Sequence, residues 1–186
     1  MKHAFPCGSL PLDLVGTLRA RRNEVPAECL GVPADVDDWL AQSGILPGAA
    51  STAASSAATL TAALALRESI YALVWARLHE EPLPAEAVRE LNEFATAPAL
   101  GAALTDAGWE PRGTPEYALG SIAREAVAII GGPDSALLRE CSRPECTQVY
   151  LDHSRGHRRE WCSMKTCGSR VKAAAYRARK REEAAA

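Results

Sequence analysis

Four cysteines near the end of the chain form two close pairs, Cys141-x4-Cys146 and Cys162-x4-Cys167, with 15 residues between the pairs. Each pair can supply two thiolates from one tight turn, and the residues between the pairs can bring them together. Pro144 in the first loop favours such a turn. The spacing therefore predicts a tetrahedral Zn²⁺ site with four thiolate ligands. An iron–sulfur cluster is the alternative, because four thiolates also suit that chemistry.

The other thiols and the histidines are expected to stand outside this site. The N-terminal sequence MKHAFPCGSLPLDL lacks the continuous apolar segment of a secretory signal, so we expect a cytoplasmic protein. In that reducing compartment, clustered cysteines bind metal more often than they form disulfides. Cys7 and Cys29 are isolated in the sequence and are expected to be buried or idle. His153 and His157 are expected to lie on the surface, because the cysteines already provide four ligands.

Positive charge is concentrated around and after the cysteines. Residues 139–181 contain 12 Lys/Arg and 4 Asp/Glu, a formal charge of +8, whereas residues 1–138 carry −8. An acidic body with a basic end is one signature of nucleic-acid binding. The side chains expected to contact nucleic acid lie on the turn between the cysteine pairs and on the segment after Cys167. They are Arg155, Arg158, Arg159, Arg170, Lys172, Arg177, Arg179, Lys180 and Arg181.

The segment SRVKAAAYRARKR (169–181) predicts a helix that starts close to Cys167. At about 100° per residue its basic side chains form two stripes on opposite sides, which could reach both strands of a DNA groove. Alternatively, the helix is solvated and only neutralises the zinc site, or it docks on the acidic body. The first stripe is Arg170, Arg177 and Arg181, and the second is Lys172 and Arg179.

The sequence before the cysteines predicts an all-helical body. The chain is 47% apolar and only 5% aromatic, and its abundant alanine favours helices. Apolar residues follow the helical period in five segments: 10–21, 33–44, 60–80, 83–97 and 114–132.

Three further segments lie between or within these helices. Residues 48–58 suit either a loop or the start of the next helix, and residues 100–114 have room for a short hairpin. The apolar run 57–66 stops at Arg67, and we expect it to be too short to span a membrane.

Composition changes at GGPDS (131–135), so we expect a helical domain over 1–135 and a small module over 136–186. The segment 147–152 predicts a short strand, and HSRGH (153–157) predicts the turn of a hairpin between the cysteine pairs. So small a module needs metal to fold. The expected fold is mainly α, an N-terminal helical bundle with a small C-terminal treble-clef-like four-cysteine zinc module.

The stretch LDHSRGHRREWCSMKTCGSRVKAAAYRARKR (151–181) resembles the CGNR-type zinc finger, whose pattern is LD.S....R.WCSM..CGNR.KA..YR.R after a cysteine pair. LPLDLVGTLRAR (10–21), PADVDDWLAQSGIL (33–46) and LRESIYAL (66–73) are similar to successive motifs of ABATE, the helical module usually joined to that finger. The resemblance covers most of the chain. It implies a bacterial transcription regulator linked to stress, with zinc as its metal.

Two positions depart from the family pattern. Ser169 stands where the finger has asparagine; serine can cap a helix start, so we expect the fold to be kept without the contacts of the asparagine. Gly16-Thr17 stands where the helical module has Asn-Thr, which weakens any site built on that asparagine. Asp13 and Thr17 share one face of the first predicted helix. Capping or interhelical hydrogen bonds are their expected role, and lining a ligand pocket is the alternative.

These observations predict a zinc-dependent DNA-binding transcription regulator, with a helical domain for sensing or dimerisation. The alternative is a zinc-stabilised protein–protein interaction module that does not bind DNA. We expect no catalysis, because the sequence has no phosphate loop or nucleophile motif and four cysteines leave no open metal position. The expected partner is DNA, with a second copy of the chain or a small-molecule effector as further candidates, and no membrane.

Overall fold

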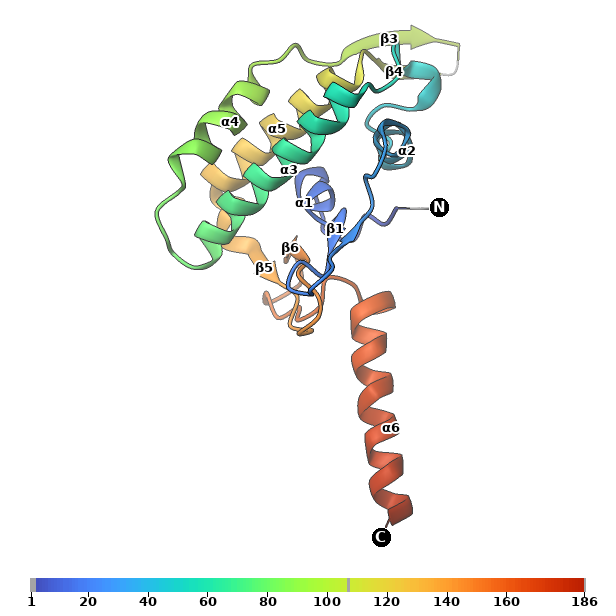
Figure 1. The fold of residues 1–186 in the computed structure, drawn as a ribbon, viewed down its shortest axis with the longest axis vertical. Coiled ribbons are helices and arrows are strands. Elements are labelled where there is room, and N and C mark those ends of the chain that lie inside the picture. The colour runs from blue at the N-terminus through green and yellow to red at the C-terminus, as the bar shows by residue number, and fades with distance from the viewer. Residues whose placement is uncertain (1–2, 107, 186) are drawn as a thin grey trace.

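A helical bundle makes up most of the molecule, as the computed structural model shows for residues 3–106 and 108–185 (Figure 1). The long α3 is its central helix and packs against the other four, while α6 extends away from the bundle. The mainly α architecture predicted from the sequence is confirmed. The helices are α1 (Leu10–Val15), α2 (Pro33–Ser43), α3 (Ala57–Leu78), α4 (Ala85–Ala95), α5 (Pro115–Gly131) and α6 (Ser169–Ala185).

Short antiparallel strand pairs complete the fold. β5 runs beside β6 with Leu138 opposite Leu151, and the pair β3–β4 confirms that residues 100–114 hold a hairpin. The strands are β1 (Leu18–Arg19), β2 (Ala27–Glu28), β3 (Gly101–Thr105), β4 (Gly108–Arg112), β5 (Leu138–Glu140) and β6 (Val149–Leu151).

One hydrophobic core serves both the bundle and the C-terminal module. β5 packs on α3 and β6 packs on α1, so that Leu138 and Tyr150 are buried in the same cluster as Leu12 and Ile70. The Leu151 backbone N–H donates to the carbonyl of Cys7 at 2.9 Å, which ties β6 to the N-terminal segment. The module around the cysteines is therefore built against the bundle.

Local signals set the starts of two helices. Residues 48–56 are a loop with a short 3-10 turn at Gly48–Ala50. α3 begins at Ala57 because the Ser56 hydroxyl accepts a hydrogen bond from the Thr59 N–H at 3.1 Å. At the start of α2, the Asp35 carboxylate accepts a hydrogen bond from the Val32 N–H at 3.1 Å.

The prediction of a helix over 10–21 is wrong beyond Val15. The chain turns at Gly16, and Leu18–Arg19 form β1, which pairs with Ala27–Glu28. Thr17 holds this turn: its hydroxyl donates to the Leu14 carbonyl at 2.7 Å and its own carbonyl accepts from the Cys29 N–H at 3.0 Å.

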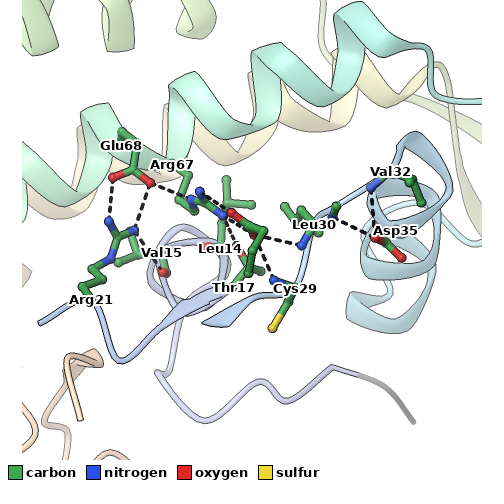
Figure 2. Close-up of polar contacts among 12 residues, drawn as sticks. Leu14, Val15, Thr17, Arg21, Cys29, Leu30, Val32, Asp35, Arg67 and Glu68 are labelled. Atoms are coloured by element: carbon green, nitrogen blue, oxygen red, sulfur yellow. Dashed lines mark hydrogen bonds and ion pairs between the residues drawn. The ribbon is translucent and has the colours of Figure 1, made fainter. Parts of the chain in front are cut away.

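A polar network around Arg67 explains why the chain turns after α1 (Figure 2). Arg67 is only 4% exposed, and its guanidinium binds both carboxylate oxygens of Glu28, at 2.7 and 2.8 Å. The same guanidinium donates to the Thr17 hydroxyl at 3.2 Å and to Glu68 at 2.8 Å. Although burial opposes ionisation of Glu28, the hydrogen bonds from Arg67 hold the pKa of that carboxyl below its usual value. Satisfying a buried arginine of α3 thus requires β2 to lie beside the turn after α1.

Arg21 extends this network toward the C-terminal module. Its guanidinium donates to Glu68 at 2.6 Å and lies 4.1 Å from the centre of the Tyr71 ring (Figure 2 shows the bond to Glu68). Its backbone N–H donates to the Thr147 hydroxyl at 3.2 Å. The segment after α1 therefore bridges α3 and the cysteine module.

The apolar helix α3 is longer than the run 57–66 considered from the sequence. It spans 22 residues, and by length and composition alone it is the one helix among the described residues that could cross a membrane. Its buried side chains, which include Leu66, Ile70 and Leu73, are covered by the neighbouring helices as the core of the bundle.

Asp13, on the buried side of α1, accepts a hydrogen bond from the Cys7 N–H at 3.0 Å. The bond ties α1 to the segment that precedes it, whereas capping or an interhelical hydrogen bond was expected. Burial raises the pKa of Asp13 from 3.8 to about 6, with a contribution from the charge of Glu125. Because the folded-state pKa is raised, the stability it contributes is full below about pH 4 and is lost as the pH rises through 6.

Replacing Asp13 with asparagine should remove this loss, because the amide oxygen can still accept from Cys7 and carries no charge. The free energy of unfolding of the variant minus that of wild type should increase by about 2–3 kcal/mol from pH 4 to pH 7.5. Urea unfolding at both pH values measures the difference. Acid release of metal affects both proteins equally and cancels. A difference that does not change with pH would contradict the buried-carboxylate assignment.

Candidate metal centre

The four predicted ligands lie together, in the loop between β5 and β6 and in the segment that leads into α6. The Sγ atoms of Cys141, Cys146, Cys162 and Cys167 are all within 4.8 Å of one another, and three of the four residues are buried. Cys162 Sγ lies 3.9 Å from Cys146 Sγ and 3.6 Å from Cys167 Sγ. A tetrahedral Zn²⁺ with Zn–S bonds of about 2.3 Å would place its sulfurs about 3.8 Å apart. The cluster therefore has the size of a single tetrahedral ion, whereas a multi-iron cluster holds its thiolates further apart.

The hairpin β5–β6 carries the first cysteine pair. Cys141 follows β5, and its N–H donates to the Gln148 carbonyl at 3.0 Å. The loop then tightens, with the Cys146 N–H donating to the Arg143 carbonyl at 2.8 Å. Both thiols thus come from one turn, as the spacing predicts.

The expected hairpin between the cysteine pairs is not present. β6 is indeed a strand, but it pairs with β5, and among the described residues no strand follows the turn 153–157. Asp152 closes this turn instead: its carboxylate accepts from the Ser154 N–H at 2.9 Å and from the Arg159 N–H at 3.0 Å. The hydrogen bonds from Ser154 and from the Arg159 backbone hold the pKa of Asp152 at about 2. The buried carboxylate therefore stays ionised and fixes the path of the chain into Cys162.

The second cysteine pair begins the basic helix. Cys167 lies in a π turn (Met164–Gly168) that runs directly into α6, which confirms the predicted position of this ligand at a helix start. The cap is Ser163, whose hydroxyl accepts from the Lys165 N–H at 3.2 Å. Ser169 does not cap the helix as expected, because it is already helical and its hydroxyl donates to the Met164 carbonyl at 2.7 Å.

Arg159 has a different role from the one expected. Its guanidinium donates to the carbonyls of Trp161 at 2.8 Å and Pro6 at 3.0 Å, and also to that of Cys162. It lies 4.4 Å from the centre of the Tyr150 ring. Arg159 therefore fastens the cysteine segment to the N-terminal segment.

Arg143, which the sequence analysis missed, contacts the sulfur cluster. Its guanidinium donates to Cys167 Sγ at 3.8 Å and to Glu145 at 2.8 Å, and the contact with Cys167 raises the pKa of Arg143. Four thiolates around Zn²⁺ carry a formal charge of −2, which an adjacent guanidinium stabilises. Hydrogen bonds from Cys146 and Cys162 lower the pKa of Cys141. The position of Arg143 two residues after Cys141 was the only signal in the sequence for its contact with the sulfur cluster.

The remaining basic candidates are exposed. α6 stands clear of the bundle in Figure 1, so the alternative in which it docks on the acidic body does not hold for this structure. The exposed side chains are Arg155 and Arg158 on the turn, and Arg170, Lys172, Arg177, Arg179, Lys180 and Arg181 on α6.

Comparison with known protein families gives two matches. Residues 8–133 match ABATE, described as "Putative stress-induced transcription regulator", and residues 138–180 match the CGNR zinc finger. No curated protein matches the chain. The four clustered cysteines lie within the second match, and together these findings identify the metal as zinc. The prediction of zinc is confirmed, as is the resemblance to both families.

Proposed function

Because the chain belongs to the ABATE family and ends in a CGNR zinc finger, we propose that it is a transcription regulator that binds DNA through α6. The observation that carries this proposal is the position of the metal site at the start of an exposed basic helix. The zinc ion fixes where that helix begins and how it leaves the body. In this proposal the protein works in the cytoplasm and has no catalytic role, since four thiolates complete a structural zinc site.

The dimensions and charge of α6 suit a DNA groove. Its 17 residues extend over roughly 26 Å at about 1.5 Å per residue. A helix of this kind fits the major groove, which is about 12 Å wide. The two basic stripes face opposite sides of the helix, so each can reach a different phosphate backbone. The acidic body would be repelled by DNA, which favours an approach with α6 leading.

A protein partner is the second candidate. Met164 in the π turn is 50% exposed and Tyr176 on α6 is 57% exposed, and such side chains are common in protein–protein contacts. In this alternative an acidic protein surface would take the place of DNA. A partner recovered after nuclease treatment, with no DNA retained, would favour it. Dimerisation and binding of a small-molecule effector by the bundle stay predictions.

We expect DNA affinity to fall steeply with salt, because binding to phosphates releases counterions. Contact with about five phosphates gives a slope of about −4.5 in a plot of log affinity against log salt concentration. Fluorescence anisotropy of a labelled duplex at about 50 to 200 mM salt measures this slope. Replacing Arg177, Arg179 and Arg181 with glutamine should make the slope about 2.7 units less negative.

The matched control replaces Arg89 with glutamine, since this exposed arginine lies on α4 and forms ion pairs with exposed glutamates of its own helix. Its slope should equal that of wild type. Absence of binding at low salt, or binding that does not depend on salt, would refute the proposal.

A further inference from the structure

A cavity of about 470 Å³ lies where the helical body, the first cysteine loop and the start of α6 meet. We call it the junction cavity. Cys146, Cys162 and Cys167 contribute to its lining, and this part belongs to the zinc site. The rest of the lining is strongly basic and lies outside the ligand set: it includes Arg19, Arg143, Lys165 and Arg170.

Three of these cations form no ion pair with the acidic residues that the structure describes. Arg143 is bound to Glu145, the one acidic residue of the lining, and to Cys167. Within the described parts of the chain, no ion pair involves Arg19, Lys165 or Arg170. The four cations of the lining outnumber its negative charges, which are Glu145 and the formal −2 of the zinc–thiolate site, so the cavity keeps a net positive charge that favours an anion.

The three cations come from separate elements. Arg19 is on β1 of the helical body, Lys165 is in the π turn, and Arg170 is in the first turn of α6. Asn23, Thr147 and Gln148 add neutral polar groups to the same lining. Guanidinium, ammonium and neutral hydrogen-bonding groups around one cavity are the kind of surroundings that phosphate oxygens require.

The junction cavity is connected with the basic surface of α6. A second hollow is lined by Arg143, Arg170, Ala174 and Arg177, among others, so Arg170 belongs to both. Arg170 and Arg177 also belong to the first stripe of α6. A nucleic-acid backbone that follows this stripe toward the start of the helix therefore arrives at the junction cavity.

We propose that the junction cavity holds one backbone phosphate of bound DNA, with Arg19, Lys165 and Arg170 as its ligands. This inference rests on the proposed function and extends it: the helical body contributes Arg19 to the nucleic-acid interface. Bound DNA then contacts the body and the zinc module at the same point, and this fixes the orientation of the body on the duplex.

Arg19→Gln in the full-length zinc-loaded protein is the decisive variant, because Arg19 lies outside the cysteine module. Loss of one phosphate contact should make the salt slope about 0.9 units less negative. The ratio of affinities at 50 and 200 mM salt should then fall about 3-fold, in anisotropy measurements with a labelled duplex. Lys165→Gln should give a similar change. Zinc content and circular dichroism show whether each variant keeps its fold.

Arg112→Gln is the matched control, since Arg112 is exposed on β4, far from α6 (Figure 1 shows the two elements). Its slope should equal that of wild type. If wild type binds DNA and Arg19→Gln behaves like this control, the phosphate site is refuted while the proposed function stands. If wild type does not bind DNA, both fail.

A free phosphate ion is the other candidate occupant of the junction cavity, in place of a DNA backbone phosphate. If the site needs a DNA backbone, inorganic phosphate added at constant ionic strength should not raise the unfolding temperature of wild type by more than it raises that of Arg19→Gln. Phosphate-dependent stabilisation of wild type alone, with equal DNA slopes for the two proteins, would assign the cavity to a small anion and overturn the proposal.

Discussion

Replacing Cys162 with serine should release the zinc ion and unfold the C-terminal module. Cys162 is buried, and its sulfur lies 3.9 Å from that of Cys146 and 3.6 Å from that of Cys167. Zinc binding supplies about 10–16 kcal/mol of apparent free energy to small zinc fingers, so the loss of one thiolate removes much of what holds the module together. The start of α6 and the pair β5–β6 should lose their order together, because the cysteines connect them.

Zinc stoichiometry after dialysis against a weak chelator measures this effect, and near-ultraviolet circular dichroism reports the loss of packing around Trp161. Cys29→Ser is the matched control, since Cys29 lies outside the sulfur cluster. The control should retain one zinc ion per chain. Unchanged zinc content in Cys162→Ser would show that the ligand assignment is wrong.

Replacing Arg67 with alanine should lower the free energy of unfolding of the bundle by about 3–5 kcal/mol. The substitution leaves Glu28 and Glu68 without their shared cation and removes the donor to the Thr17 hydroxyl. Glu68 keeps its bond to Arg21. Glu28, whose side chain is 34% exposed, loses the guanidinium that binds both of its carboxylate oxygens, and β2 loses this link to α3. The turn after α1 would be released with it.

Urea unfolding monitored by far-ultraviolet circular dichroism measures this loss in zinc-loaded protein. Arg89→Ala provides the control, because Arg89 also bonds to two glutamates but is 66% exposed. Exposed pairs contribute about 1 kcal/mol at most, so the control should change stability little. Equal effects of the two substitutions would mean that the Arg67 network does not stabilise the fold.

Features set by nearby residues could be predicted from the sequence. The period of apolar residues identified α2 to α5, because each of these helices buries one face against the others. The cysteine spacing identified the metal site, since each pair forms its own turn. The glycine at position 44 marked the end of α2, where the chain adopts φ +79°.

Features set by distant residues could not be predicted. The first helix looked longer than it is, because Arg67, which binds Thr17 in the turn after the helix, lies 50 residues away in the sequence. Arg159 looked like a surface cation, and only the fold brings the Pro6 carbonyl to it from 153 positions away. Likewise β6 was recognised as a strand, but its partner depends on how the module packs against α1 and α3.

The core shared by the bundle and the C-terminal module has a consequence for the amount of protein in a cell. Since β5 and β6 contribute Leu138 and Tyr150 to the core that α1 and α3 form, zinc binding and folding of the whole chain are linked by mass action. Each tenfold rise in free zinc above the dissociation constant adds about 1.4 kcal/mol to the stability of the folded state. When zinc is scarce, more chains populate open forms that proteases degrade. Metal supply would then determine how many copies of the regulator persist, as well as whether its basic helix is formed.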